Sequence, residues 1–137
     1  MEELKGALTL SDIYMAKLRI KKLFQATPCA RTHFGVDSGL EVVVKEENLS
    51  PTGSYYDRAV LNSLLSLSEE QQRRGVITAS ECRSFIRALF YYGPELGVPV
   101  TLVVPCGSEI HRQMWSQPGK IIVSCGNDIK EVSEIMS

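Results

Sequence analysis

The feature that most constrains the fold is a strand, a helix and a second strand in direct succession within residues 75–105. Residues 75–80 and 97–105 are short, apolar runs rich in β-branched side chains, which is typical of buried strands. Between them, apolar side chains recur at helical spacing over about residues 81–92. Two strands joined by one helix pair in parallel through a right-handed connection. This stretch therefore predicts a βαβ unit.

The same alternation continues on both sides of this unit. Residues 40–44 are apolar and predict a buried strand, and residues 120–124 predict another strand. The polar segment 68–74 predicts a solvated linker. Strands that alternate with helices are typical of α/β proteins, so the sequence predicts an α/β fold with an open, mainly parallel sheet flanked by helices. The other helices are expected at residues 12–24 (capped by Ser11), at 54–67, after 107–109 (with Met114 and Trp115) and after 126–128.

Composition limits the classes of function. A chain of 137 residues, 44% hydrophobic and 23% charged, is typical of one soluble globular domain. Its net charge of −1 gives no reason to expect nucleic acid or an acidic membrane as a partner. No apolar run approaches membrane-spanning length and the acidic N-terminus lacks a secretion signal, so the cytosol is the expected compartment. The four cysteines form no metal-binding pair, so reduced, partly buried thiols and no metal site are expected.

A tight turn connects the apolar run at residues 40–44 to the helix that follows it. Pro51 fixes its own backbone φ, Gly53 can adopt angles that other residues avoid, and Ser54 can cap the helix start. A helix start of this kind is a natural place to present a reactive side chain or to bind an anion. Residues 47–58 are therefore the first candidate for a functional site.

This segment resembles the cofactor-lysine segment of the serine/threonine dehydratase and serine racemase family, the fold-type II pyridoxal-phosphate enzymes. The family pattern is Glu-X-X-Gln-X-Thr-Gly-Ser-Phe-Lys-X-Arg, in which Tyr55 replaces the phenylalanine and Tyr56 stands at the position of the lysine. Residues 27–31, 75–80 and 97–105 also resemble family segments, in the same order. The residues in register with the pattern are Glu47, Thr52, Gly53, Ser54 and Arg58.

The resemblance covers roughly residues 9–136, which correspond to the N-terminal part of a longer family chain. It implies the fold of the small domain of these enzymes for residues 46–137. Residues 1–45, with the N-terminal helix and the first strand, are then a remnant of the larger domain, and the C-terminal catalytic half of the family is absent. Apolar side chains of this remnant are expected either to fold back on the small domain or to form a sticky patch.

The resemblance also implies that the catalytic groups have changed. Tyr56 carries a phenol, which cannot form the Schiff base that a lysine forms with pyridoxal phosphate. Where the family has a Ser/Ala-Gly-Asn-His loop after a strand, Glu81 stands at the small or catalytic serine position and Arg83 at the asparagine position. The other residues of the former cofactor loop are Ser80, Cys82 and Ser84.

These changes lead to the expectation that no cofactor binds. Neither Lys45 nor Lys120 is placed like the family lysine, and Tyr56 is expected to pack rather than to act as an acid or a base. Cys82 follows a strand at an expected helix N-terminus beside Arg83, and both features lower the pKa of a thiol. Cys82 therefore has two interpretations: it is either a reactive thiol or a half-buried, unreactive cysteine. Both histidines, His33 and His111, are expected to be surface residues.

Three interpretations of function follow. The first is a catalytically inactive, truncated serine/threonine dehydratase-like protein that acts through association, as a homo-oligomer or with a full-length relative. The alternative is a pyridoxal-phosphate-dependent ammonia-lyase acting on L-serine or L-threonine, or a serine racemase-like enzyme, that needs a lysine from a further chain. The third is a gene product without a selected role.

Overall fold

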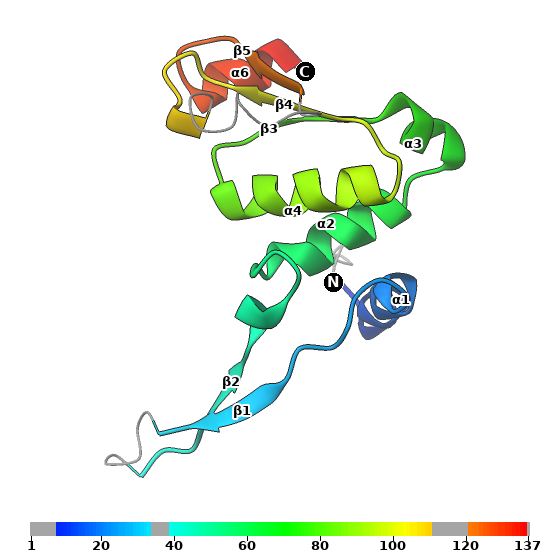
Figure 1. Ribbon diagram of the computed structural model, residues 1–137, viewed down its shortest axis with the longest axis vertical. Coiled ribbons are helices and arrows are strands. Elements are labelled where there is room, and N and C mark those ends of the chain that lie inside the picture. The colour runs from blue at the N-terminus through cyan, green and yellow to red at the C-terminus, as the bar shows by residue number, and fades with distance from the viewer. Residues whose placement is uncertain (1–7, 34–38, 111–120, 137) are drawn as a thin grey trace, which may run out of the picture.

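The computed structural model describes residues 8–33, 39–110 and 121–136, and its centre is a three-stranded parallel sheet. The strands are β3 (Val76–Ala79), β4 (Val100–Val104) and β5 (Ile121–Ser124), in the spatial order β3-β4-β5. Helices α2 (Tyr56–Leu65) and α4 (Arg83–Glu95) lie on one face of this sheet, and α6 (Ile129–Met136) lies on the other (Figure 1). The expected α/β fold with a mainly parallel sheet flanked by helices is confirmed.

The central strand β4 is the most buried strand of the sheet. Four of its five residues are buried, so side chains on both faces are covered, as the sequence predicts. In the register of the sheet, Leu102 on β4 lies opposite Thr78 on β3 and Ile122 on β5. The βαβ unit of β3, α4 and β4 is thereby confirmed, with α4 running from Arg83 to Glu95.

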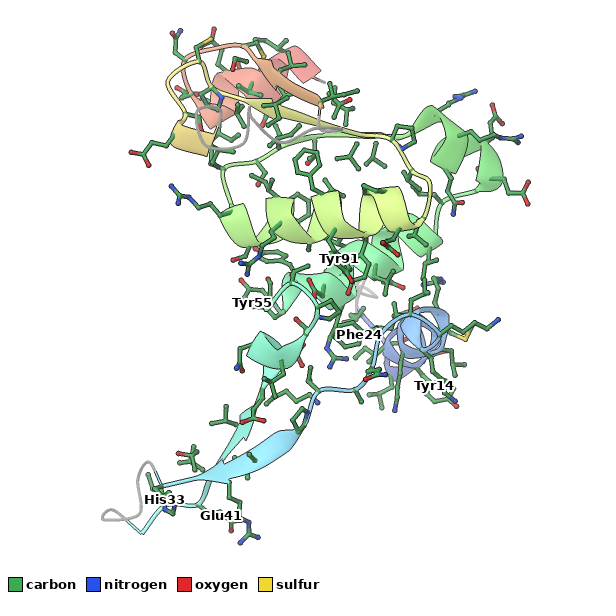
Figure 2. The ribbon with its side chains drawn as sticks, viewed as in Figure 1. Tyr14, Phe24, His33, Glu41, Tyr55 and Tyr91 are labelled. Carbon is green, nitrogen blue, oxygen red and sulfur yellow. The ribbon has the colours of Figure 1, made fainter. Side chains whose placement is uncertain are left out.

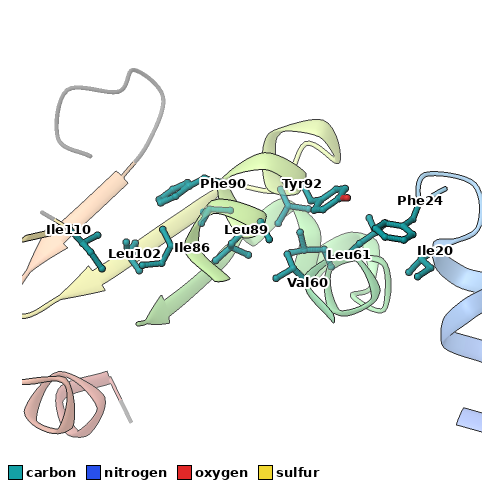
Figure 3. Close-up of a cluster of buried hydrophobic side chains, with 14 of the residues drawn as sticks. Ile20, Phe24, Val60, Leu61, Ile86, Leu89, Phe90, Tyr92, Leu102 and Ile110 are labelled. Carbon is teal, nitrogen blue, oxygen red and sulfur yellow. The ribbon is translucent and has the colours of Figure 1, made fainter. Parts of the chain in front are cut away.

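The hydrophobic core lies between the sheet, α4 and α2 (Figure 3). Helix α1 (Leu10–Ile20) packs beside α2, and two side chains of the N-terminal segment, Ile20 and Phe24, are buried in the same core. Other apolar side chains of the segment remain outside, since Ile13 is 52% exposed. The N-terminal segment therefore partly folds back and partly leaves an exposed apolar surface.

Helix α1 begins earlier than the sequence suggests. Its cap is Thr9 rather than Ser11, because the Thr9 hydroxyl accepts from the backbone N–H of Asp12 at 3.2 Å. The Asp12 carboxylate in turn accepts from the Thr9 backbone N–H at 2.9 Å, which completes a reciprocal capping box.

The run expected to form a buried strand is instead one side of an exposed hairpin. Strand β2 (Val42–Lys45) pairs antiparallel with β1 (Cys29–Thr32), a strand that the sequence did not predict. This hairpin arm, β1 with β2, extends away from the body of the molecule, and the labelled His33 and Glu41 lie at its far end (Figure 2). Val43 is 55% exposed because no other element covers the arm in the described part of the chain. The burial prediction for residues 40–44 is therefore wrong, whereas His33 is exposed as expected.

The prediction of a linker at residues 68–74 is also wrong, because this segment contains helix α3 (Glu69–Arg74). Ser68 caps this helix in a reciprocal pair with Gln71. The helix ends at Gly75, whose φ of 84° lies in the left-handed region. The capping box was visible in the sequence, but the segment has no apolar periodicity to indicate a helix.

Two further expectations concern the C-terminal part. The cap before α6 is confirmed, because the Asp128 carboxylate accepts from the backbone N–H groups of Lys130 and Glu131, each at 2.9 Å. The helix expected after residues 107–109 falls mostly on residues 111–120, outside the described residues, together with His111, Met114, Trp115 and Lys120. Among the described helices, none combines the length and the hydropathy that crossing a bilayer requires.

Candidate functional site

The turn between the hairpin arm and α2 is built from small hydroxyl residues around one glycine. A short 3-10 helix, Glu47–Leu49, leads into it, and Gly53 has a φ of 69°, which a side chain would disfavour. The Ser54 hydroxyl accepts from the Tyr56 backbone N–H at 3.1 Å, and the Ser50 hydroxyl accepts from the Ser54 N–H at 3.0 Å. Gly53 thus has the expected left-handed conformation. The N-cap of α2 is Tyr55 rather than the expected Ser54, although the Ser54 hydroxyl accepts from the first N–H of the helix.

A fully buried carboxylate holds this turn against α2. Asp57 accepts from the backbone N–H of Thr52 at 2.9 Å and also from the Thr52 hydroxyl. Burial, with the Asp57 charge as a second cause, raises the pKa of Tyr92 on α4 above its usual range. The burial of Asp57 has no signal in the sequence, because a charged residue in the first turn of a helix usually faces solvent.

A second polar network fixes the start of α2 to the N-terminal segment. The Arg58 guanidinium donates to both oxygens of the Glu47 carboxylate, from Nε and Nη2 at 2.9 Å each, and Nη2 also donates to the Thr27 hydroxyl at 3.1 Å. The Thr27 hydroxyl donates to Glu47 Oε1 at 2.6 Å. The Arg58 guanidinium also lies 4.5 Å from the centre of the Phe24 ring. The two charged residues that matched the family pattern therefore form a bidentate pair that anchors the turn.

This network sets the pKa values of its members. Hydrogen bonding from Arg58 holds the pKa of Glu47 below its usual value, and Thr27 acts in the same direction. The Glu47 carboxylate raises the pKa of Arg58. Lys45 donates from Nζ to the backbone carbonyl of Thr27, so its ammonium group is directed at the backbone rather than at residue 56.

Tyr56 is the first residue of α2 and is packed against other aromatic rings. Its ring stacks on Tyr55, with centroids 4.6 Å apart, and meets the edge of Phe85 on α4 at 5.7 Å. The neighbouring Tyr55 hydroxyl, followed by the Cys82 thiol, raises the pKa of Tyr56 to about 12. The phenol is therefore protonated near neutral pH, so it cannot act as a general base there.

Cys82 lies at the N-cap of α4, next to Tyr56. Hydrogen bonding from the Phe85 backbone N–H is the main cause that lowers the pKa of the Cys82 thiol, and the Tyr56 hydroxyl contributes. A lowered pKa of the Cys82 thiol was expected from the sequence, partly because of Arg83. The Arg83 guanidinium instead pairs with the Glu109 carboxylate at 3.2 Å. Cys82 is exposed rather than half-buried.

The structure brings Tyr56 and Cys82 together but directs Glu81 and Arg83 to a different place. These two charged side chains line an open cavity of about 540 Å³ beyond the carboxyl ends of the three parallel strands. Glu109 and Asp128 also line it, so three carboxylates face one guanidinium there. This balance disfavours an anionic ligand in the cavity. The remaining loop residues, Ser80 and Ser84, are both half-buried, and the Ser80 hydroxyl accepts from the Cys82 N–H at 3.1 Å.

A metal site would need a cluster of histidine, cysteine or carboxylate side chains. Within residues 8–33, 39–110 and 121–136, no three of them come together in a way that could hold a metal ion. Cys29, Cys82 and Cys106 are exposed and Cys125 is partly exposed, all as free thiols.

Comparison with known proteins places this arrangement in a family. A sequence model described as pyridoxal-phosphate dependent enzyme matches residues 20–137. The chain belongs to this family. It is 33% identical to L-threonine ammonia-lyase from Thermotoga maritima over 72% of this chain and 24% of that protein. It is 36% identical to serine racemase from Dictyostelium discoideum over 73% of this chain and 31% of that protein.

Solved structures of the pyridoxal-phosphate family have the same fold. Serine racemase from Dictyostelium discoideum superimposes with a TM-score of 0.78 and 28% identity, over 94% of this chain and 43% of that one. A pyridoxal 5'-phosphate-dependent aspartate racemase superimposes with a TM-score of 0.77 and 29% identity, over 99% and 43%. The chain thus spans about a quarter to a third of the sequence length of the relatives named above.

Membership of the family corrects the expectation that no cofactor is involved. That expectation is wrong, because the matched family is described by its dependence on pyridoxal phosphate, and the similar aspartate racemase is described in the same way. The error came from equating the expected loss of one attachment residue with the loss of the whole cofactor. A cofactor can be held by many contacts, of which the covalent bond to a lysine is one.

The residues around position 56 do not fit covalent attachment of this cofactor. An aldehyde is captured by an amine, and residue 56 offers a phenol whose ring stacks on Tyr55 and meets the edge of Phe85. The Lys45 ammonium group donates to the Thr27 carbonyl. The preserved part of the family segment, from Glu47 to Arg58, is instead engaged in holding the turn.

Proposed function

We propose that this chain is a member of the pyridoxal-phosphate family that does not catalyse amino-acid chemistry on its own and acts through association with another polypeptide. The observation that carries the proposal is the phenol of Tyr56 at the place of the family lysine. Its pKa of about 12 and its packing against Tyr55 and Phe85 support a structural role for the side chain. The proposal concerns covalent attachment and catalysis, and leaves pyridoxal phosphate as the cofactor of the family.

Reduction with borohydride tests the first half of this proposal. The purified chain is incubated with pyridoxal phosphate and reduced, and its tryptic peptides are examined for a pyridoxyl group on lysine. We expect only weak labelling spread over surface lysines, equal in the wild type and in Tyr56→Phe. The Tyr56→Lys variant, which restores the family residue, is expected to gain one specific label at position 56.

The contradicting outcome is equally specific. One strongly labelled lysine in the wild-type chain, together with release of a keto acid from L-serine or L-threonine, would overturn the proposal. Thermal unfolding of both variants serves as the control, because Tyr56 also packs against Phe85 and its replacement changes that contact.

A second candidate function is supported by the identity of 33% to L-threonine ammonia-lyase. In this alternative, the chain forms part of an ammonia-lyase that uses L-serine or L-threonine and receives its lysine from a further chain. Keto-acid release is measured for each amino acid with this chain alone, with a full-length relative alone, and with both together. Activity of the mixture beyond the sum of its parts favours the alternative, whereas a simple sum or inhibition favours the non-catalytic proposal.

A further inference from the structure

Helix α1 exposes a row of apolar side chains on the side that faces away from the core. Leu10, Tyr14 and Leu18 are 85%, 59% and 44% exposed. Because they are spaced four residues apart, they lie next to one another along the helix, and we call them the outer row. The labelled Tyr14 lies on the side of α1 that is remote from α2 (Figure 2). Of the residues of α1, only Ile20 is buried, although a helix with apolar residues on every side is normally covered on every side.

Basic side chains flank the outer row. At about 100° per residue, Lys17 and Lys21 lie at one border of the row, and Lys22 follows directly. All three are exposed, and no ion pair joins any of them to a carboxylate of residues 8–33, 39–110 and 121–136. The one acidic residue of α1, Asp12, is already bonded to the Thr9 backbone N–H and hydroxyl. The outer row is therefore an apolar ridge with a positively charged, uncompensated border.

Shape and charge together indicate what fits this surface. From Leu10 to Leu18, the outer row is about 12 Å long at 1.5 Å per residue, which is about two turns of helix. A row at positions i, i+4 and i+8 is the ridge that packs into the groove between the ridges of another helix. Charges at the border of such a seam select the partner, and lysines select carboxylates. An acidic amphipathic helix therefore satisfies both features.

We propose that the outer row of α1 and the lysines beside it bind an acidic amphipathic helix of another polypeptide. The inference rests on the proposed action through association and names the surface for it. A second copy of this chain fits less well, because the lysines of two facing α1 helices repel each other. An anionic membrane also fits less well, because the chain has a net charge of −1 and the outer row is a narrow stripe.

Binding of a designed helix tests the inference. The probe is a fluorescently labelled peptide with blocked ends that repeats the sequence Glu-Leu-Ala-Ala-Leu-Glu-Ala, added to the full chain and followed by fluorescence anisotropy. Its leucines form one row, with the glutamates beside them. We expect saturable binding that weakens as the salt concentration rises. A matched peptide with lysine in place of every glutamate is expected to bind at least about tenfold more weakly.

Two double variants test the row and its charges separately. Tyr14→Ser with Leu18→Ser removes most of the ridge at exposed positions, so we expect binding of the acidic peptide to be at least about tenfold weaker. Lys17→Glu with Lys21→Glu keeps the ridge and reverses the charge of its border. This second variant is expected to bind the acidic peptide more weakly and the lysine peptide more tightly than the wild type does, an exchange of preference that a folding defect cannot produce.

Matched controls make the same kinds of change on another exposed helix. Ile135 on α6 is 60% exposed, and the Lys130 side chain on the same helix is 85% exposed. Ile135→Ser and Lys130→Glu are therefore expected to bind the acidic peptide like the wild type. Circular dichroism confirms that each variant is folded.

Three results would overturn the inference. Equal binding of the acidic and the lysine peptide, or binding unaffected by both double variants, would place the peptide elsewhere. Sedimentation with vesicles of phosphatidylcholine and phosphatidylserine, without any peptide binding, would assign the outer row to an anionic membrane. A concentration-dependent dimer that Tyr14→Ser with Leu18→Ser abolishes would assign it to a second copy. None of these results depends on the borohydride experiment, so failure here leaves the non-catalytic proposal to its own test.

Discussion

At the scale of single residues, the start of α2 and the start of α4 form one chemical unit. Tyr56 and Cys82 are 26 positions apart, yet the thiol raises the pKa of the phenol and the phenol lowers the pKa of the thiol. Tyr56, which we propose to stand at the position of the family lysine, thus changes the pKa of its neighbour Cys82. The pKa values of the two groups are shifted in opposite directions. The phenol therefore stays protonated, and the neighbouring thiol ionises more readily.

Alkylation rates measure this coupling. Because a thiolate is the reactive form, we expect Cys82 to react with iodoacetamide at pH 7.5 faster than the other exposed thiols, Cys29 and Cys106. In Tyr56→Phe the hydroxyl is lost, so Cys82 should react roughly two- to fivefold more slowly. Peptide mass spectrometry at timed intervals gives each rate separately. A Cys82 rate that does not change in Tyr56→Phe would show that the backbone N–H groups alone lower its pKa.

The ion pair of Glu47 and Arg58 makes the stability of the protein depend on pH. The pKa of Glu47 is lower in the folded chain than its ordinary value of 4.5, chiefly through Arg58. Its contribution to the free energy of unfolding is therefore complete above about pH 4.5 and is lost as the pH falls through the lowered folded pKa. We expect Glu47→Gln to lower stability by about 1–2 kcal/mol at pH 7 and to flatten the acid side of the stability profile.

Urea denaturation between pH 3 and pH 7 measures this profile. Glu46→Gln is the matched control, since it removes one carboxylate in the neighbouring position and no bond to Arg58. A profile of Glu47→Gln that runs parallel to that of the wild type would contradict the assigned role of the pair.

At the scale of elements, the packing of α4 on the sheet depends on the absence of a side chain at Gly93. A Cβ at this position would collide with the Val100 side chain on β4 and approach the Val98 carbonyl to 3.1 Å. We expect Gly93→Ala to lower the free energy of unfolding by about 1–2 kcal/mol, because the strain of overpacking exceeds the gain in helix propensity. Gly107→Ala is the control, since no heavy atom lies within 4 Å of a Cβ there. Equal stability of the two variants, measured by urea denaturation, would contradict close packing.

The elements also differ in how far the sequence could define them. The strand β4 and the helices α2 and α4 were predictable, because each carries an apolar pattern that matches its own burial. The strands β3 and β5 were predictable from their apolar runs, although Ile77 and Ile121 are exposed. Residues 40–44 carry the same pattern without the burial, and no local signal distinguishes an apolar strand in a core from one in an exposed arm. The site was predictable where the family segment is preserved. The burial of Asp57 and the contact of Tyr56 with Cys82 depend on tertiary packing and could not be predicted.

At the scale of the whole molecule, the chain combines a packed body with an exposed arm. The body contains the sheet, its helices and the core, into which the N-terminal segment inserts Ile20 and Phe24. The division into a domain remnant of residues 1–45 and a small domain of residues 46–137 stays a prediction. Ile20 and Phe24 nevertheless pack in the same core as side chains from the second segment. Among the described residues, the two strands of the arm and both outer strands of the sheet, β3 and β5, are each paired on one side only.

Hydrogen exchange distinguishes the body from the arm. A two-stranded hairpin that packs against nothing is marginally stable in water, so its opening does not require the rest of the molecule to unfold. We expect the backbone amides of β2 (Val42–Lys45) to exchange at least about 100-fold faster than those of β4 (Val100–Val104), which is buried on both faces. Protection of β2 equal to that of β4 in the free chain would instead mean that the arm is covered in solution, and would identify it as the surface through which the chain associates.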